Sequence, residues 1–122
     1  MTTHRVRRVE SLLAREISDL LVKEIKDPRV SQVTVVEIEA SGDLRRAVIY
    51  YRLLSNDIEH RKEAESGLKS AAGTLKRMIG ERVRLKFMPE LVFRYDPTED
   101  KAERIEALLR EVASEGDSRE NE

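Results

Sequence analysis

The sequence predicts an α+β domain in which helices cover one three-stranded sheet. Apolar residues follow helical spacing in four stretches and two-residue alternation in three, in the order helix, strand, strand, helix, helix, strand, helix. Leu, Ile, Val and Phe make up 33 of the 122 residues, above the roughly 20% below which chains stay disordered. A chain of this length holds one core, so we expect a single domain over residues 1–113.

The first helix is expected over residues 4–26. Its apolar residues recur every three or four positions from Val6 to Ile25, which is the spacing of one helical face. Thr3 is a suitable N-cap. Asp27-Pro28 ends the helix, because proline biases the residue before it away from the helical region.

Two strands, over residues 30–40 and 44–54, are expected to form an antiparallel hairpin around the turn residues 41–43. Alternation in the first strand predicts one face with Thr34, Val36, Ile38 and Ala40 and another with Val33, Val35, Glu37 and Glu39. Alternation in the second strand predicts one face with Ala47, Ile49, Tyr51 and Leu53 and another with Arg46, Val48, Tyr50 and Arg52.

A second helix is expected over residues 57–71. Asn56 followed by Glu59 is the pattern of a capping box. Glycine costs about 1 kcal/mol in a helix interior. We therefore expect a break at Ala71-Ala72-Gly73 and a short further helix over residues 74–81.

The remaining chain predicts one more strand and one more helix. Residues 83–95 alternate around Met88-Pro89, and the half after the proline is the better strand. Asp96-Pro97 then begins a helix with an apolar stripe from Ile105 to Val112. Residues 114–122 contain no large apolar side chain, so we expect a disordered acidic tail.

The charge is divided unevenly along the chain. Residues 1–95 carry 19 basic and 14 acidic side chains, whereas residues 96–122 carry 4 basic and 10 acidic ones. A basic body with an acidic appendage is typical of nucleic-acid-binding domains, because the basic side chains neutralise phosphates. A solvated surface of mixed charge is the alternative that composition leaves open.

Two basic groups are candidates for phosphate contacts. Six cations against one carboxylate, Glu81, lie between positions 69 and 86. The second group, Arg5, Arg7 and Arg8, lies at the start of the first helix. Cations there oppose the helix dipole, which suggests that they bind an external anion. A frayed helix terminus is the alternative. If a helix begins at Gly73-Thr74, its free N–H groups can also hold a phosphate; otherwise Gly73 only allows close packing on the sheet.

Other classes of function find little support. The chain has no Cys and two His, His4 and His60, so we expect no enzyme, metal or cofactor. It has no apolar run of membrane-spanning length and no secretory signal, so we expect a cytoplasmic protein. All five aromatic residues fall on predicted strands, where a core role is favoured over base stacking: Tyr50, Tyr51, Phe87, Phe93 and Tyr95. We therefore expect recognition of phosphates and RNA shape rather than base readout.

The chain resembles the ribosome-binding factor A family, whose fold is a K-homology-like (type II) α+β domain. Five segments carry the resemblance, in order and at compatible spacing over residues 5 to about 110: Arg5-Val6 with Arg8-Val9, Lys26-Asp27-Pro28-Arg29-Val30, Asp43-Leu44-Arg45-Arg46-Ala47, Ala71-Ala72-Gly73-Thr74-Leu75, and Pro89-Glu90-Leu91-Val92-Phe93-Arg94-Tyr95-Asp96. The resemblance implies a helix–kink–helix in which Ala71, Ala72 and Gly73 replace the Gly-x-x-Gly loop of other K-homology domains.

The resemblance also implies a function without catalysis: binding the immature small ribosomal subunit and its rRNA, and assisting late maturation, including that of the 5′ end. Together with the basic groups it predicts these RNA contacts: Arg5, Arg7, Arg8, Arg46, Lys69, Ala71, Ala72, Gly73, Thr74, Lys76, Arg77, Arg82, Arg84 and Lys86. We expect a monomer. Two alternatives stay open, a module that docks an assembly GTPase or another protein and a general RNA chaperone.

Overall fold

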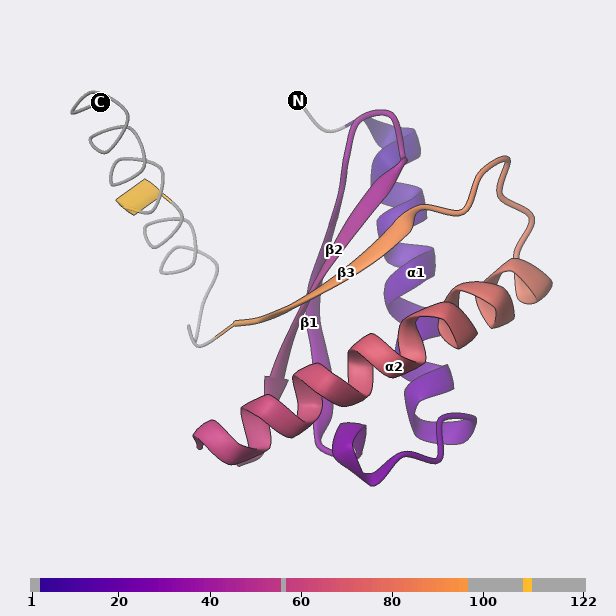
Figure 1. The fold of residues 1–122 in the computed structure, drawn as a ribbon. Helices are drawn as coiled ribbons and strands as arrows, with labels where there is room; N and C mark the ends of the chain where they lie inside the picture. Colours follow the sequence, from indigo (N-terminus) through magenta and orange to yellow (C-terminus); the bar gives the residue numbers. More distant parts are fainter. Residues whose placement is uncertain (1–2, 56, 97–108, 111–122) are drawn as a thin grey trace, which may run out of the picture.

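In the computed structural model the chain forms a three-stranded sheet with two long helices packed on it (Figure 1). The structure describes residues 3–55, 57–96 and 109–110. Its elements are α1 (His4–Lys23), the 3-10 helix η1 (Pro28–Val30), β1 (Val33–Ala40), β2 (Arg46–Leu53), α2 (Ile58–Arg82) and β3 (Glu90–Tyr95). The predicted α+β class and three-stranded sheet are confirmed.

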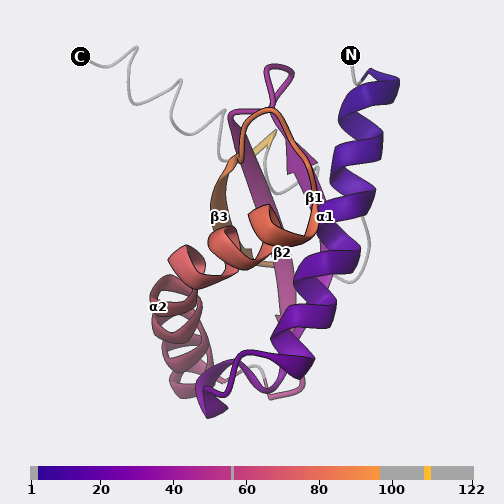
Figure 2. The ribbon, with the colours of Figure 1, turned by 90° about the vertical axis from the view of Figure 1, so that its right-hand side faces the viewer.

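The sheet has the order β1-β2-β3, with β2 in the middle. β1 and β2 pair antiparallel, as the predicted hairpin requires, and β2 and β3 pair parallel. Parallel neighbours need a crossover connection, and α2 provides it (Figure 2).

The core lies between the two helices and one face of the sheet. α1 contributes Leu13 and Ile17, and α2 contributes Leu68, Leu75 and Ile79, all with no exposed surface. The same cluster contains three alternating residues of β2, Ala47, Ile49 and Tyr51. These three residues share one face of β2, as the alternation predicted, and that face lies against the core.

The predicted faces of β1 are wrong in the first half of the strand. The pairing with β2 shifts between Val35 and Glu37, which is a β-bulge. Because a bulge adds one residue, the alternation changes sides there. Val33 and Val35 pack against the core on the same side as Ile38, whereas Val36 is 40% exposed.

The predicted break at Ala71-Ala72-Gly73 is wrong, because α2 is one helix from Ile58 to Arg82. Ala71 and Leu75 belong to a buried stripe that continues through this region. Gly73 lies on the exposed side, and burial of the stripe outweighs its cost of about 1 kcal/mol. The N-cap is Asp57, whose carboxylate accepts from the His60 N–H at 2.9 Å; Asn56 lies outside the described residues.

Other boundaries differ from expectation by a few residues. α1 begins after its predicted cap, with Thr3 Oγ1 accepting from the Val6 N–H at 3.2 Å, but it ends at Lys23. Residues 83–88 form no strand, and β3 begins only after Pro89. The helix expected after Asp96 lies outside the described residues except for Leu109 and Arg110, which are helical, and so does the tail expected over residues 114–122.

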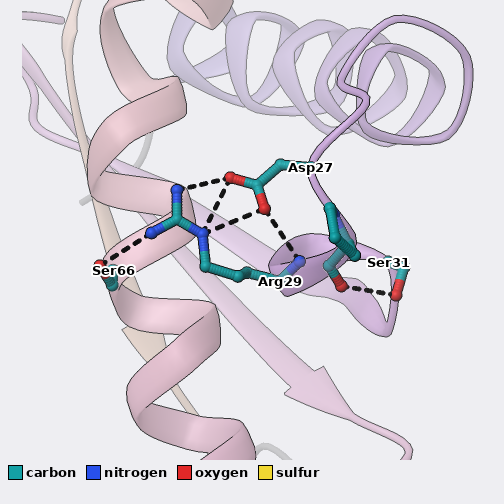
Figure 3. Close-up of polar contacts among 5 residues, drawn as sticks. Asp27, Arg29, Ser31 and Ser66 are labelled. Atoms are coloured by element: carbon teal, nitrogen blue, oxygen red, sulfur yellow. Dashed lines mark hydrogen bonds and ion pairs between the residues drawn. The ribbon is translucent and has the colours of Figure 1, made fainter.

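A hydrogen bond from Arg29 to Ser66 attaches the segment after α1 to α2, and an ion pair with Asp27 holds Arg29 in place (Figure 3). The Asp27 carboxylate accepts from the Arg29 backbone N–H at 2.9 Å and from its Nη2 at 2.6 Å. Arg29 Nη1 in turn donates to Ser66 Oγ of α2 at 3.1 Å. Beside this contact, Gly67 leaves no room for a side chain, since a Cβ atom there would lie 2.8 Å from Val30 Cγ1.

Asp27→Asn is expected to destabilise the fold at neutral pH and to have little effect in acid. Hydrogen bonds from Arg29 hold the pKa of Asp27 below its ordinary value. The carboxylate therefore stabilises the fold above the unfolded pKa of about 3.9, and this contribution is lost as pH falls through the lower folded pKa. Asn retains the capping oxygen. Thermal unfolding of both proteins over a pH series should show the gap in Tm closing below about pH 4; a constant gap would contradict this.

Candidate nucleic-acid interface

Two basic stretches that are far apart in sequence lie side by side at one end of the molecule. The start of α1 and the connection from α2 to β3 meet near the hairpin turn (Figures 1 and 2). Five arginines line an open hollow of about 710 Å³ there, and its walls include Leu12 and Leu85. We call it the arginine hollow; its cations are Arg5, Arg7, Arg8, Arg15 and Arg84. None of the described residues that line it is acidic.

A second hollow of about 410 Å³ adjoins the first, because Arg5 and Arg84 line both. It adds Lys86 and the ring of Phe87. Asp43 of the hairpin turn is the carboxylate at its edge. The Ser41 hydroxyl and the Arg45 N–H donate hydrogen bonds to the Asp43 carboxylate and lower its pKa. Asp43 therefore carries a negative charge at the edge of the second hollow.

The fold holds both basic stretches firmly. In α1 the apolar stripe with Val6, Val9 and Leu13 is buried, which leaves the arginines on the other faces. In the connection, Leu85 and Met88 pack against the core and Pro89 is fully buried. The side chains of Arg84, Lys86 and Phe87 are consequently exposed.

The cations of the arginine hollow have little internal compensation. Among the described residues, Arg15 Nε lies 3.9 Å from Glu16 Oε1, and no ion pair is found for the other four arginines or for Lys86. Like charges gathered without carboxylates create a positive field that attracts an anionic partner. Phosphates of a nucleic acid would supply the missing negative charge.

The family model for ribosome-binding factor A matches residues 5–109. The chain belongs to the ribosome-binding factor A family. A ribosome-binding factor A from Halothermothrix orenii is 40% identical over 118 residues, which are 97% of this chain and 96% of the relative. The family resemblance drawn from the sequence is confirmed.

A solved structure and a fitted homology model of similar proteins share this fold. A Thermotoga maritima protein, determined by NMR in solution, superposes with a TM-score of 0.66 at 29% identity and covers 80% of this chain and 93% of its own. The Thermus thermophilus ribosome binding factor A, as a homology model fitted into the cryo-EM map of a 30S complex, has a TM-score of 0.54 at 24% identity. It covers 72% of this chain and 96% of its own.

In this member of the ribosome-binding factor A family, three of the predicted cations on α2 are paired with carboxylates. Lys76 Nζ lies 3.5 Å from Glu90 and Arg77 Nη1 lies 3.2 Å from Glu81. Arg82 bridges to α1, at 2.8 Å from Asp19 and 3.1 Å from Glu16. The hydrogen bonds to Asp19 and Glu16 raise the pKa of Arg82, and that from Arg82 lowers the pKa of Asp19.

The phosphate site predicted at the start of a helix over residues 74–81 does not exist, because no helix begins there. Gly73 and Thr74 lie inside α2, where backbone N–H groups donate to carbonyls of the preceding turn. Ala71 is buried in the core and Ala72 is half-buried. Lys69 of α2 and Arg46 at the start of β2 are exposed, but neither lines the arginine hollow.

Sequence reasoning missed two residues of this surface. Arg15 follows Arg8 by seven residues, two helical turns, so helical spacing could have placed both on one face.

Phe87 is the second residue. The sequence predicts it on a strand, with its side chain in the core, but it lies outside the strands and is 66% exposed. The partly buried Met88 and the fully buried Pro89 take the inward positions instead, and the alternation of residues 83–87 gave no signal of this. The other four aromatic residues lie on β2 and β3 as predicted.

Proposed function

We propose that this chain is a ribosome assembly factor that binds the immature small ribosomal subunit in the cytoplasm, as a monomer, through contacts with its rRNA. Membership of the ribosome-binding factor A family supports this, as does the Thermus relative, which was fitted into the map of a 30S complex. The observation that carries the RNA contact is the arginine hollow, which five arginines line without a lining carboxylate among the described residues.

The proposed contacts are with phosphates. Arg5, Arg8 and Arg84 would bind the backbone of a folded rRNA segment, and Arg7, Arg15 and Lys86 would extend the contact at either side. Among the other predicted residues, Lys69 and Arg46 remain candidates for outer contacts because they are exposed. The paired cations Lys76, Arg77 and Arg82 would first have to leave their carboxylates.

The proposed mode of action is binding without catalysis. A factor that prefers one arrangement of rRNA shifts the population toward it by its differential affinity and permits the next step when it leaves. We propose that the arrangement favoured here is one that allows late maturation of the small-subunit rRNA, including its 5′ end.

Sucrose-gradient sedimentation tests the proposed partner. The full chain is expected to migrate with free small subunits and to be depleted from complete ribosomes, because a factor for immature particles leaves before the subunits join. Equal occupancy of both peaks, or absence from both, would contradict the proposal. The control variant carries Lys26→Glu and Lys62→Glu, which reverse two exposed cations that do not line the arginine hollow. It should migrate in the gradient as the unaltered chain does.

Salt and nuclease distinguish the two alternatives. An RNA contact loses affinity steeply as salt rises, whereas a complex with a GTPase or another protein should withstand both moderate salt and nuclease treatment. A general RNA chaperone should bind unrelated RNAs as tightly as it binds small-subunit rRNA. We expect salt-sensitive, nuclease-sensitive binding that favours small-subunit rRNA.

A further inference from the structure

The geometry points to a base-stacking site: we propose that the exposed ring of Phe87 stacks on an unpaired base while the cations around it hold the adjoining phosphates. This inference rests on the proposed function, since it names how the same surface engages RNA. It also departs from the expectation that favours a core role over base stacking for the aromatic residues.

Phe87 differs from the other aromatic residues of the chain. All five lie in the described part of the chain, and Phe87 alone is exposed, whereas Tyr50 and Tyr51 are buried and Phe93 and Tyr95 are partly buried. Tyr95 is moreover engaged within the protein, edge-on to Tyr51 and covered by the Arg61 guanidinium at 4.3 Å. At 66% exposure, Phe87 is thus the aromatic side chain of this set with its ring turned furthest to solvent, with Lys86 Nζ over one face of it.

The position of Phe87 is fixed by its neighbours. Met88 packs against the core and Pro89 is fully buried, and together they attach the connection to the sheet directly after the ring. Leu85 packs against the core on the other side. A backbone segment held between such anchors loses little conformational freedom when RNA binds, which favours affinity.

The charge around the ring fits one class of ligand. Arg5, Arg84 and Lys86 line the same hollow as Phe87, and Lys86 Nζ lies 5.7 Å from the ring centroid. The remaining exposed apolar side chains, including Val22, Leu54 and Ile58, are aliphatic and do not line either basic hollow. An aromatic ring bordered by cations is the arrangement that single-stranded nucleic acids bind, because every base has a face that can stack and every nucleotide carries a phosphate.

The required partner is therefore unpaired RNA rather than a duplex. In a helix the bases are stacked on each other and their faces are unavailable, whereas loops, bulges and ends can present a base to an aromatic side chain. The arginine hollow would bind phosphates in either case. Phe87 would add a preference for a segment with at least one unpaired base.

The chain contains no Trp, which allows a direct test. Phe87→Trp places the single indole in the proposed site. Leu54→Trp is the matched control, because Leu54 is 89% exposed and directly follows the end of β2 that is farther from the hairpin turn. Each full-length variant is titrated with a short single-stranded oligoribonucleotide and with the duplex that it forms with its complement. We expect single-stranded RNA to quench the fluorescence of Phe87→Trp only.

A second variant measures the contribution to affinity. Phe87→Leu keeps an apolar side chain but removes the aromatic face, and it should weaken binding of the single strand by about five- to a hundredfold while changing duplex binding little. If Phe87→Trp is not quenched although the protein binds RNA, or if strand and duplex quench it equally, the stacking site is wrong and the proposed function stands. If the unaltered chain binds neither RNA nor small subunits, both fail.

Discussion

Reversing two charges of the arginine hollow, Arg8→Glu together with Arg84→Glu, is expected to weaken binding of single-stranded RNA at least about 25-fold at about 0.1 M salt. Each phosphate contact to a single strand releases about 0.7 of a counterion, so two lost contacts account for this factor and the repulsion of the new carboxylates adds to it. The log–log salt slope should become shallower by about 1.4. Fluorescence anisotropy over a series of salt concentrations measures both quantities.

The fold should tolerate the double variant. Both side chains are exposed, and a carboxylate near the start of α1 interacts favourably with the helix dipole. Thermal unfolding should therefore give nearly the same Tm as the unaltered chain. Lys26→Glu with Lys62→Glu makes the same change in net charge on cations that lie outside the arginine hollow, and it should leave RNA affinity within about twofold.

A third variant compares the arginine hollow with the paired cations of α2. Lys76→Glu with Arg77→Glu should weaken RNA binding less than the Arg8 and Arg84 pair, because those two cations already face Glu90 and Glu81. An equal or larger loss from Lys76 and Arg77 would assign the interface to α2 instead. The comparison is direct, since both double variants change the net charge equally.

The same substitution at two glycines of α2 is expected to have opposite effects on stability. Gly67→Ala introduces a Cβ 2.8 Å from Val30 Cγ1 and 2.9 Å from Arg29 Cβ, so the η1 segment must move. Overpacking of this kind costs about 1–3 kcal/mol, and the better helix propensity of Ala returns about 1 kcal/mol. The free energy of unfolding should fall by up to about 2 kcal/mol.

Gly73→Ala is the matched substitution in open space. Apart from its chain neighbours and the backbone of its own helix, no atom of the described residues lies within 4 Å of its Cβ position, so helix propensity should raise the free energy of unfolding by up to about 1 kcal/mol. Urea denaturation of both variants measures the difference, and a shift of the same sign at both positions would contradict the close approach of Gly67 to η1. Gly73→Ala should also leave RNA affinity unchanged, because Gly73 lies outside the arginine hollow.

Local patterns predicted most of the secondary structure because they depend on neighbours in sequence. The stripe of α1 and the inward face of β2 follow from spacing alone, and both are buried as expected. The β1 bulge and the continuous α2 escaped prediction for a common reason. Pairing with β2 determines the bulge in β1, and burial of Ala71 and Leu75 keeps α2 continuous. Neither contact is visible in a short window of sequence.

By itself the sequence determined the α+β class, the basic character of residues 1–95 and the resemblance to one family. Only the tertiary structure decided which cations can act together. Arg84 joins Arg5 and Arg8, whereas Arg82, two residues earlier, turns to Asp19 and Glu16 of α1, 63 and 66 residues away in the chain. Electrostatic interactions depend on distance in space, and a chain acquires those distances only when its helices and strands pack.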